Sequence, residues 1–147
     1  MFIGCGHVLR LDVVRMMNGY DPFPGAYGAE EKDLCLRLMD AGYRIVKMPG
    51  VHVWHEKTPT ARDLRSQHRS GVCNDLALAL RRAPLVTLPA SIPWKLFRHV
   101  WFSAPRGLLK PCLEGIAAFT KASPNLWRSR RPVALGTLRA FRRLSHP

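Results

Sequence analysis

The sequence predicts an α/β unit over residues 1–83, followed by a basic, proline-punctuated helical tail over residues 84–147. Three observations predict this class. Strand-like and helix-like hydrophobic patterns alternate through the first part. Prolines recur through the second part and separate amphipathic segments. The charge also divides, because residues 61–147 hold sixteen of the 23 Lys and Arg residues but only three of the ten acids, and therefore carry the whole net charge of +13.

Short apolar segments predict the strands of the first part. They lie at residues 2–11, 43–48 and 51–55, with a Pro-Gly turn between the last two. Gly6, in the first segment, leaves room for another backbone or a ligand to approach closely. We therefore count Gly6 among the residues that could line a substrate site.

Helical spacing of apolar residues predicts the helices. In the first part they lie at residues 12–17, 29–41 and 60–83. Asp12 can cap the first helix, Gly42 is well placed to end the second, and Pro84 ends the third. In the tail, residues 94–102, 112–122 and 133–144 are expected to form short helices between the prolines.

Composition excludes several classes of protein. The four cysteines are widely spaced and include no C-x-x-C pair, so neither a zinc cluster nor a disulfide scaffold is expected. The first residues lack the cationic and apolar regions of a signal peptide. No run of eighteen apolar residues occurs, so no membrane span is expected.

Three acids crowd the start of the helix at residues 29–41, and a helical wheel separates them. Glu31 lies in the middle of the apolar arc, and Glu30 lies at its boundary. Asp33 and Arg37 fall on the opposite side, where they can pair on the outer face. Leu36 also falls outside the apolar arc, which indicates that a second side of this helix is covered.

A carboxylate on a packing face needs either a hydrogen-bonding partner or a functional role that explains its position. Without either, its burial costs roughly several kcal/mol. Backbone N–H groups at the helix start could hold Glu31 as a structural cap. Alternatively, Glu31 lines a pocket and acts as a general base. The wheel leaves both interpretations open.

The ordered motifs of residues 18–56 resemble the second half of the catalytic domain of family 2 glycosyltransferases, which have the GT-A fold with its Rossmann-like mixed sheet. The resemblance covers roughly residues 1–83. It is specific because the motifs keep their order and spacing. The matching residues are Gly19, Tyr20, Asp21, Glu30, Glu31, Asp33, Leu34, Arg37, Ala41, Gly42, Tyr43, Pro49 and His55.

The resemblance implies sugar transfer from a nucleotide-sugar donor to an acceptor hydroxyl, inverting at the anomeric carbon, in cell-envelope or polysaccharide synthesis. The role of general base falls on Glu31, and Glu30 would orient the acceptor. Asp21 resembles an acceptor-side acid of the family, although a turn-capping role also fits it. His55 resembles a ligand of the divalent metal, Mn²⁺ or Mg²⁺, that holds the donor diphosphate, although a structural role also fits it.

The sequence departs from the family pattern in two respects. The family usually has Asp where Glu31 stands, which keeps the base but lengthens it by one methylene. The nucleotide-binding half of the family domain and its Asp-x-Asp motif have no counterpart among the 147 residues. We therefore expect the isolated chain neither to bind nucleotide-sugar tightly nor to turn over.

The basic tail is compatible with more than one kind of partner. Aromatic residues interleaved with Lys95, Arg98 and Arg106 suit an interfacial helix, which predicts a cytoplasmic chain attached peripherally to an anionic inner membrane face. A solvated basic face around a small core is the plain alternative. A nucleic-acid-binding module would explain the clusters at residues 128–131 and 139–143, but no recognition motif accompanies them. A non-catalytic scaffold related to the enzymes is a third class.

Overall fold

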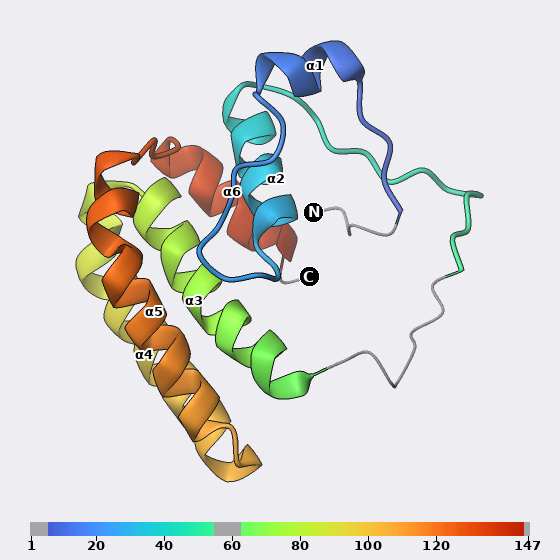
Figure 1. Cartoon of the computed structure of the whole chain (residues 1–147). Coiled ribbons are helices and arrows are strands. Elements are labelled where there is room, and N and C mark those ends of the chain that lie inside the picture. The colour runs from blue at the N-terminus through green and yellow to red at the C-terminus, as the bar shows by residue number, and fades with distance from the viewer. Residues whose placement is uncertain (1–5, 55–62, 146–147) are drawn as a thin grey trace.

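The computed structural model of the chain describes residues 6–54 and 63–145 (Figure 1). The α-helices are, in chain order, α1 (Leu11–Met16), α2 (Glu30–Asp40), α3 (Leu64–Arg82), α4 (Leu88–Ser103), α5 (Leu109–Arg128) and α6 (Leu135–Ser145). Two short 3-10 helices, η2 (Leu85–Thr87) and η3 (Ala104–Arg106), flank α4. None of these helices combines the length and the apolarity that crossing a bilayer requires.

The predicted α/β class, with the mixed sheet of a GT-A domain, is wrong. The chain is all-α, and its described ranges 6–54 and 63–145 contain no strand. The described parts of the three expected strands are irregular, and Val46, Val51 and Val53 remain more than half exposed. The alternating pattern favours an extended backbone, but a strand is stable only when neighbouring strands satisfy its edges. Within residues 6–54 and 63–145, no neighbouring strand does so.

The three helices of the first part are present, with corrections at the cap of α1 and at the start of α3, which begins at Leu64 and not near Thr60. Asp12 does not cap α1; it lies in the first turn and forms an ion pair of 2.6 Å with Arg10. Gly42 ends α2 in a left-handed conformation (φ +84°), as the sequence predicts. Asp63 caps α3, because its carboxylate accepts the Arg65 N–H at 3.0 Å. At the other end, α3 stops at Arg82, just before Pro84.

The tail folds back on α3. Helices α4 and α5 pack along one side of α3 (Figure 1), and their common core includes Val72, Leu76 and Cys112. Gly115 permits the close approach of α5, since a Cβ there would lie 2.5 Å from the Arg69 carbonyl oxygen. Both α4 and α5 are longer than predicted because Pro93 and Pro124 lie inside them. Packing against α3 offsets the backbone hydrogen bonds that these prolines remove.

Helix α2 is covered on two sides, which explains the anomalous position of Leu36. One side packs Leu34 and Leu38 against α1. The other side packs Leu36 against α3 and α6, in a cluster that includes Leu78 and Phe141. The second covered side, predicted from Leu36 alone, is therefore confirmed, and it has consequences for the charged residues of α2.

Candidate active site

The chain enters α2 through a strained turn. Gly28 and Ala29 both have left-handed backbones, with φ of +86° and +88°. This conformation costs a non-glycine residue roughly 1–2 kcal/mol, so Ala29 must be held there by its surroundings. The Asp33 N–H donates to the Ala29 carbonyl at 2.8 Å and closes the first turn. Glu30 and Glu31 thus start the helix, where no side chain caps the free N–H groups.

Asn74 of α3 holds this turn in place. Its amide oxygen accepts the Gly25 N–H at 2.7 Å. Its amide nitrogen donates to the carbonyls of Gly25, Tyr27 and Gly28 at 3.0, 3.1 and 2.7 Å. Gly25 is needed there, because a Cβ would lie 2.8 Å from the Asn74 oxygen and 2.9 Å from the Ser70 Cα. One buried side chain therefore positions the segment that leads into the acid pair.

A buried charge network ties α2 to α3 and to the loop after α1. The Asp33 carboxylate, fully buried, accepts from Arg82 Nε at 2.6 Å and from Arg37 Nε at 2.7 Å. Arg82 also donates to the Asp21 carboxylate. Arg37 donates to the carbonyl oxygens of Met17 and Gly19, and both of these distances are 2.6 Å. Arg81 also lies 4.0 Å from the Asp21 carboxylate, so each carboxylate of the network faces more than one guanidinium group, which is what makes the burial of Asp33 tolerable.

The predicted pair of Asp33 and Arg37 is present, but its predicted position on an outer face is wrong. The wheel counted only the apolar residues of α2. It could not show that α3 and α6 cover the second side of the helix and bring Arg82 against Asp33. Asp40, further along α2, remains exposed and accepts from the Ala134 N–H and the Thr137 hydroxyl, both at 2.8 Å.

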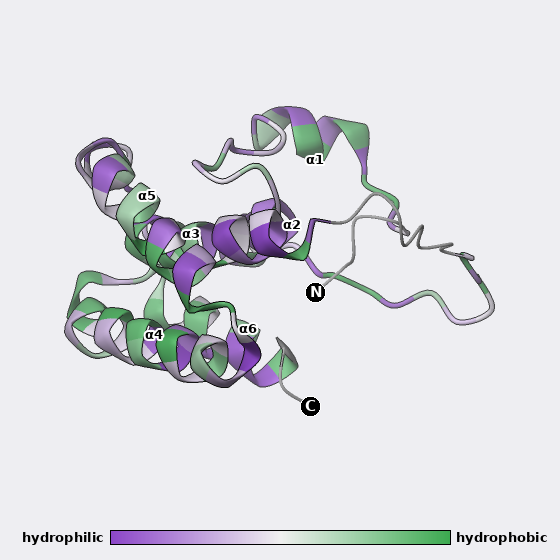
Figure 2. Cartoon of the chain, turned by 60° about the horizontal axis from the view of Figure 1, so that its bottom comes forward, coloured by the Kyte–Doolittle hydropathy of each residue, from purple (hydrophilic) through white to green (hydrophobic). Residues whose placement is uncertain are grey.

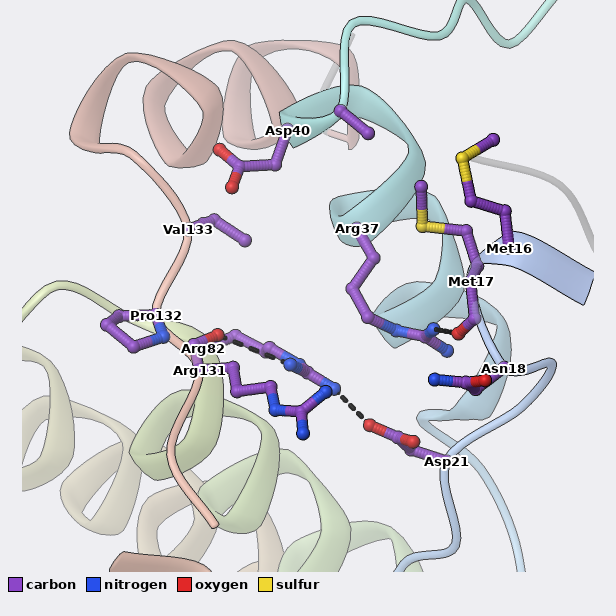
Figure 3. Close-up of a pocket in the computed structure, with 11 residues that line it drawn as sticks. Met16, Met17, Asn18, Asp21, Arg37, Asp40, Arg82, Arg131, Pro132 and Val133 are labelled. Carbon is purple, nitrogen blue, oxygen red and sulfur yellow. Dashed lines mark hydrogen bonds and ion pairs between the residues drawn. The ribbon is translucent and has the colours of Figure 1, made fainter. Parts of the chain in front are cut away.

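A pocket of about 310 Å³ opens beside this network (Figure 3). Its walls come from the loop after α1, from the second half of α2, and from residues 131–133. In Figure 3 the side chains of Arg82 and Arg131 point toward Asp21, whereas the Arg37 side chain points toward Met17. The Asp21 carboxylate is about one-third exposed, so a ligand hydroxyl can reach it. The guanidinium groups of Arg37 and Arg82 are already occupied by protein acceptors.

Glu30 and Glu31 do not line this pocket. They lie at the other end of α2, with Glu31 roughly 9 Å from Arg37 along the axis. Both are half-buried, and neither side chain forms a hydrogen bond or ion pair within residues 6–54 and 63–145. Burial and the nearby charge of Glu31 raise the pKa of Tyr20, whose hydroxyl lies 2.8 Å from His7 Nε2. Tyr20 thus lies beside the acid pair.

The structure describes one of the two other predicted site residues. Gly6 lies against Val53, whose Cγ2 is 3.2 Å from the position of a Cβ. His55 falls outside the described residues. In the part of the chain that the structure describes, no three His, Cys, Asp or Glu side chains gather into a group that could hold a metal. The divalent metal therefore stays a prediction, because its proposed ligand His55 is not among these residues.

Sequence reasoning missed three residues of this region. Asn74 and Arg82 lie inside α3, for which the sequence pattern indicates only packing, and Tyr20 stands in a motif that gives it no role of its own. A buried Asn and a buried Arg within an apolar helix face are signals in themselves, because neither is buried without partners. The sequence shows a polar Asn and a charged Arg within α3, but it does not show which groups they contact.

One family of known proteins matches most of the chain. The family described as "Glycosyl transferase family group 2" matches residues 1–130. Neither the curated proteins nor the solved structures contain a match. The matched range includes α1 to α5 and every residue of the network described above.

Proposed function

The chain belongs to glycosyl transferase family group 2, and we propose on this premise that it takes part in the transfer of a sugar from a nucleotide-sugar donor to an acceptor hydroxyl. The observation that supports a catalytic role is the Glu31 carboxylate. It is half-buried at a strained helix start and forms no hydrogen bond or ion pair with the described residues, although its charge acts on Tyr20. A structural cap would be hydrogen-bonded, whereas a base needs an available oxygen.

In the proposed reaction Glu31 removes the proton from the acceptor hydroxyl. The acceptor oxygen then bonds to the anomeric carbon while the bond from that carbon to the donor phosphate oxygen breaks. The nucleotide diphosphate leaves with the bonding electrons, and the configuration inverts. Glu30 orients the acceptor, and Asp21, partly exposed at the neighbouring pocket, provides a second acceptor-side carboxylate.

Donor binding and metal binding are not assigned to a group of residues in this chain. No Asp-x-Asp occurs in the sequence, and His55 is the single metal ligand proposed from this chain. We expect calorimetry with UDP-sugars and GDP-sugars to show no tight binding to the 147-residue chain. Tight binding would place the donor site within these residues and refute this part of the proposal.

The test of the base is Glu31→Gln in the protein as its gene encodes it. We expect transfer of labelled sugar to fall by roughly 10²–10⁴-fold, the usual contribution of a general base. Glu30→Gln should weaken acceptor binding more than turnover. Glu114→Gln, on the exposed surface of α5, is the matched control and should leave transfer unchanged. Near-normal transfer by the Glu31 variant would exclude Glu31 as the base.

The basic second part supports a location for this reaction. We propose peripheral association with an anionic membrane surface, where lipid-linked or membrane-proximal glycan acceptors are found. The support is the net charge of +13, carried entirely by residues 61–147. Association should weaken as salt is raised, because the Debye length falls from about 8 Å to about 3 Å between 0.15 M and 1 M.

A further inference from the structure

Helix α4 is apolar on two opposite faces, and only one face is covered. Ile92 and Leu96 face inward and pack on the core shared with α3 and α5. At 100° per residue, Trp94, Phe97 and Trp101 lie on the opposite side. These three side chains are 61, 55 and 72% exposed. A helix that is apolar all round is normally buried all round, so the outer face of α4 lacks a partner in this structure.

The three aromatic side chains form a continuous ladder along the outer face. The ring centroids of Trp94 and Phe97 are 5.7 Å apart, and those of Phe97 and Trp101 are 5.9 Å apart. Figure 2 shows α4 along one edge of the molecule, with apolar residues over much of its length. Phe102 does not belong to the ladder, because it stacks on His68 and lies beneath the Arg106 guanidinium at 3.8 Å.

The charges around the ladder favour an anionic partner. No acid occurs between Asp75 and Glu114, a stretch that includes all of α4. Lys95 faces inward and is bound to Asp75 at 2.6 Å, so it contributes little to the outer surface. Arg98 is half-exposed beside the ladder, 3.5 Å from Asp75. A cation thus flanks an apolar ladder that no carboxylate interrupts.

We propose that Trp94, Phe97 and Trp101 form the face by which α4 enters the headgroup region of an anionic bilayer, with Arg98 at the level of the lipid phosphates. The inference rests on the proposed membrane association and names the face that makes it. Trp favours the bilayer interface, where its ring is buried and its N–H is hydrated. A second copy of this basic chain would bring like charges together, and a nucleic acid would leave the exposed aliphatic side chains of Leu85 and Val86, which precede α4 in the chain, without a matching surface.

The experiment is flotation of the full chain with vesicles of phosphatidylcholine and phosphatidylglycerol, at low and high salt. The variant replaces Trp94, Phe97 and Trp101 by Ser, and circular dichroism verifies its fold. The matched control replaces Trp54 and Trp127, which are exposed elsewhere, by Ser. We expect the variant to lose at least roughly tenfold in vesicle affinity, because tenfold is about 1.4 kcal/mol and burial of one aromatic side chain exceeds it. The control should bind like the unaltered chain.

The outcomes separate the inference from the proposal on which it rests. Absence of binding to anionic vesicles by the unaltered chain would overturn both. Equal binding by the unaltered chain and the ladder variant would overturn only the face. Two other outcomes, each without vesicle binding, would also overturn the inference. Self-association that the ladder variant abolishes would assign the surface to a second copy of the chain, and salt-dependent binding to duplex DNA would assign it to nucleic acid.

Discussion

Replacement of Asn74 by Ala tests how the entrance to α2 is held. The Asn74 side chain is buried and makes four contacts of 2.7–3.1 Å with residues 25–28. Each net hydrogen bond contributes about 1 kcal/mol, and a buried group left without a partner costs about 1–3 kcal/mol. Some of the freed carbonyls will find water. We therefore expect a loss of about 2–4 kcal/mol in the free energy of unfolding, or about 5–15 °C in Tm for a chain of this size.

The measurement is urea unfolding at neutral pH, followed by circular dichroism. Asn125→Ala on the exposed surface of α5 is the matched control, because it introduces the same gain in helix propensity without removing a side-chain hydrogen bond that the structure shows. Its stability should change by less than about 0.5 kcal/mol. If Asn74→Ala lost no more stability than Asn125→Ala, the side chain would not be holding the loop, and the interpretation of the strained turn at Ala29 would fail with it.

Two further predictions concern the ion pairs. Arg82→Met should lower the free energy of unfolding by about 3–5 kcal/mol, because it leaves the buried Asp33 carboxylate short of a partner. The double variant with Asp33→Asn should recover a substantial part of this loss. A double variant as unstable as the single variant would contradict the assignment. Burial alone would raise the pKa of Asp75, but the hydrogen bond from His99 and the ammonium of Lys95 outweigh it and hold that pKa well below its usual range. Since the folded pKa lies below the unfolded value of about 3.9, the carboxylate stabilises the fold above that pH, and this contribution declines as the pH falls through the folded pKa. Asp75→Asn should therefore lower the urea midpoint at pH 7 and flatten its dependence on pH below about 4, whereas parallel curves for the two proteins would refute the assignment.

The helix boundaries in the first part could be predicted from the sequence because their causes are local. Gly42 ends α2 through its own backbone conformation, and α3 ends just before Pro84. The predicted strands failed for the opposite reason. The alternation at residues 43–54 is real, but a strand depends on hydrogen bonds from another segment, and the described chain offers none. The predicted ends of α4 and α5 were wrong for a similar reason, because packing on α3 allows both helices to continue past Pro93 and Pro124.

The candidate site divides in the same way. The sequence singled out Glu31 among three neighbouring acids and paired Asp33 with Arg37, because both inferences depend only on positions around one helix. It could not place Asp33 in the core, because the Arg82 that neutralises it stands 49 residues further along the chain. Nor could it show that Asn74 holds the turn before the acid pair. By itself, the sequence determined where the helices of the first part end and how the charge is distributed, but it assigned the inward position to Glu31, whereas the structure buries Asp33. The tertiary structure alone decided which charges are buried and which apolar face of α4 stays open, because both depend on contacts between segments that the chain separates.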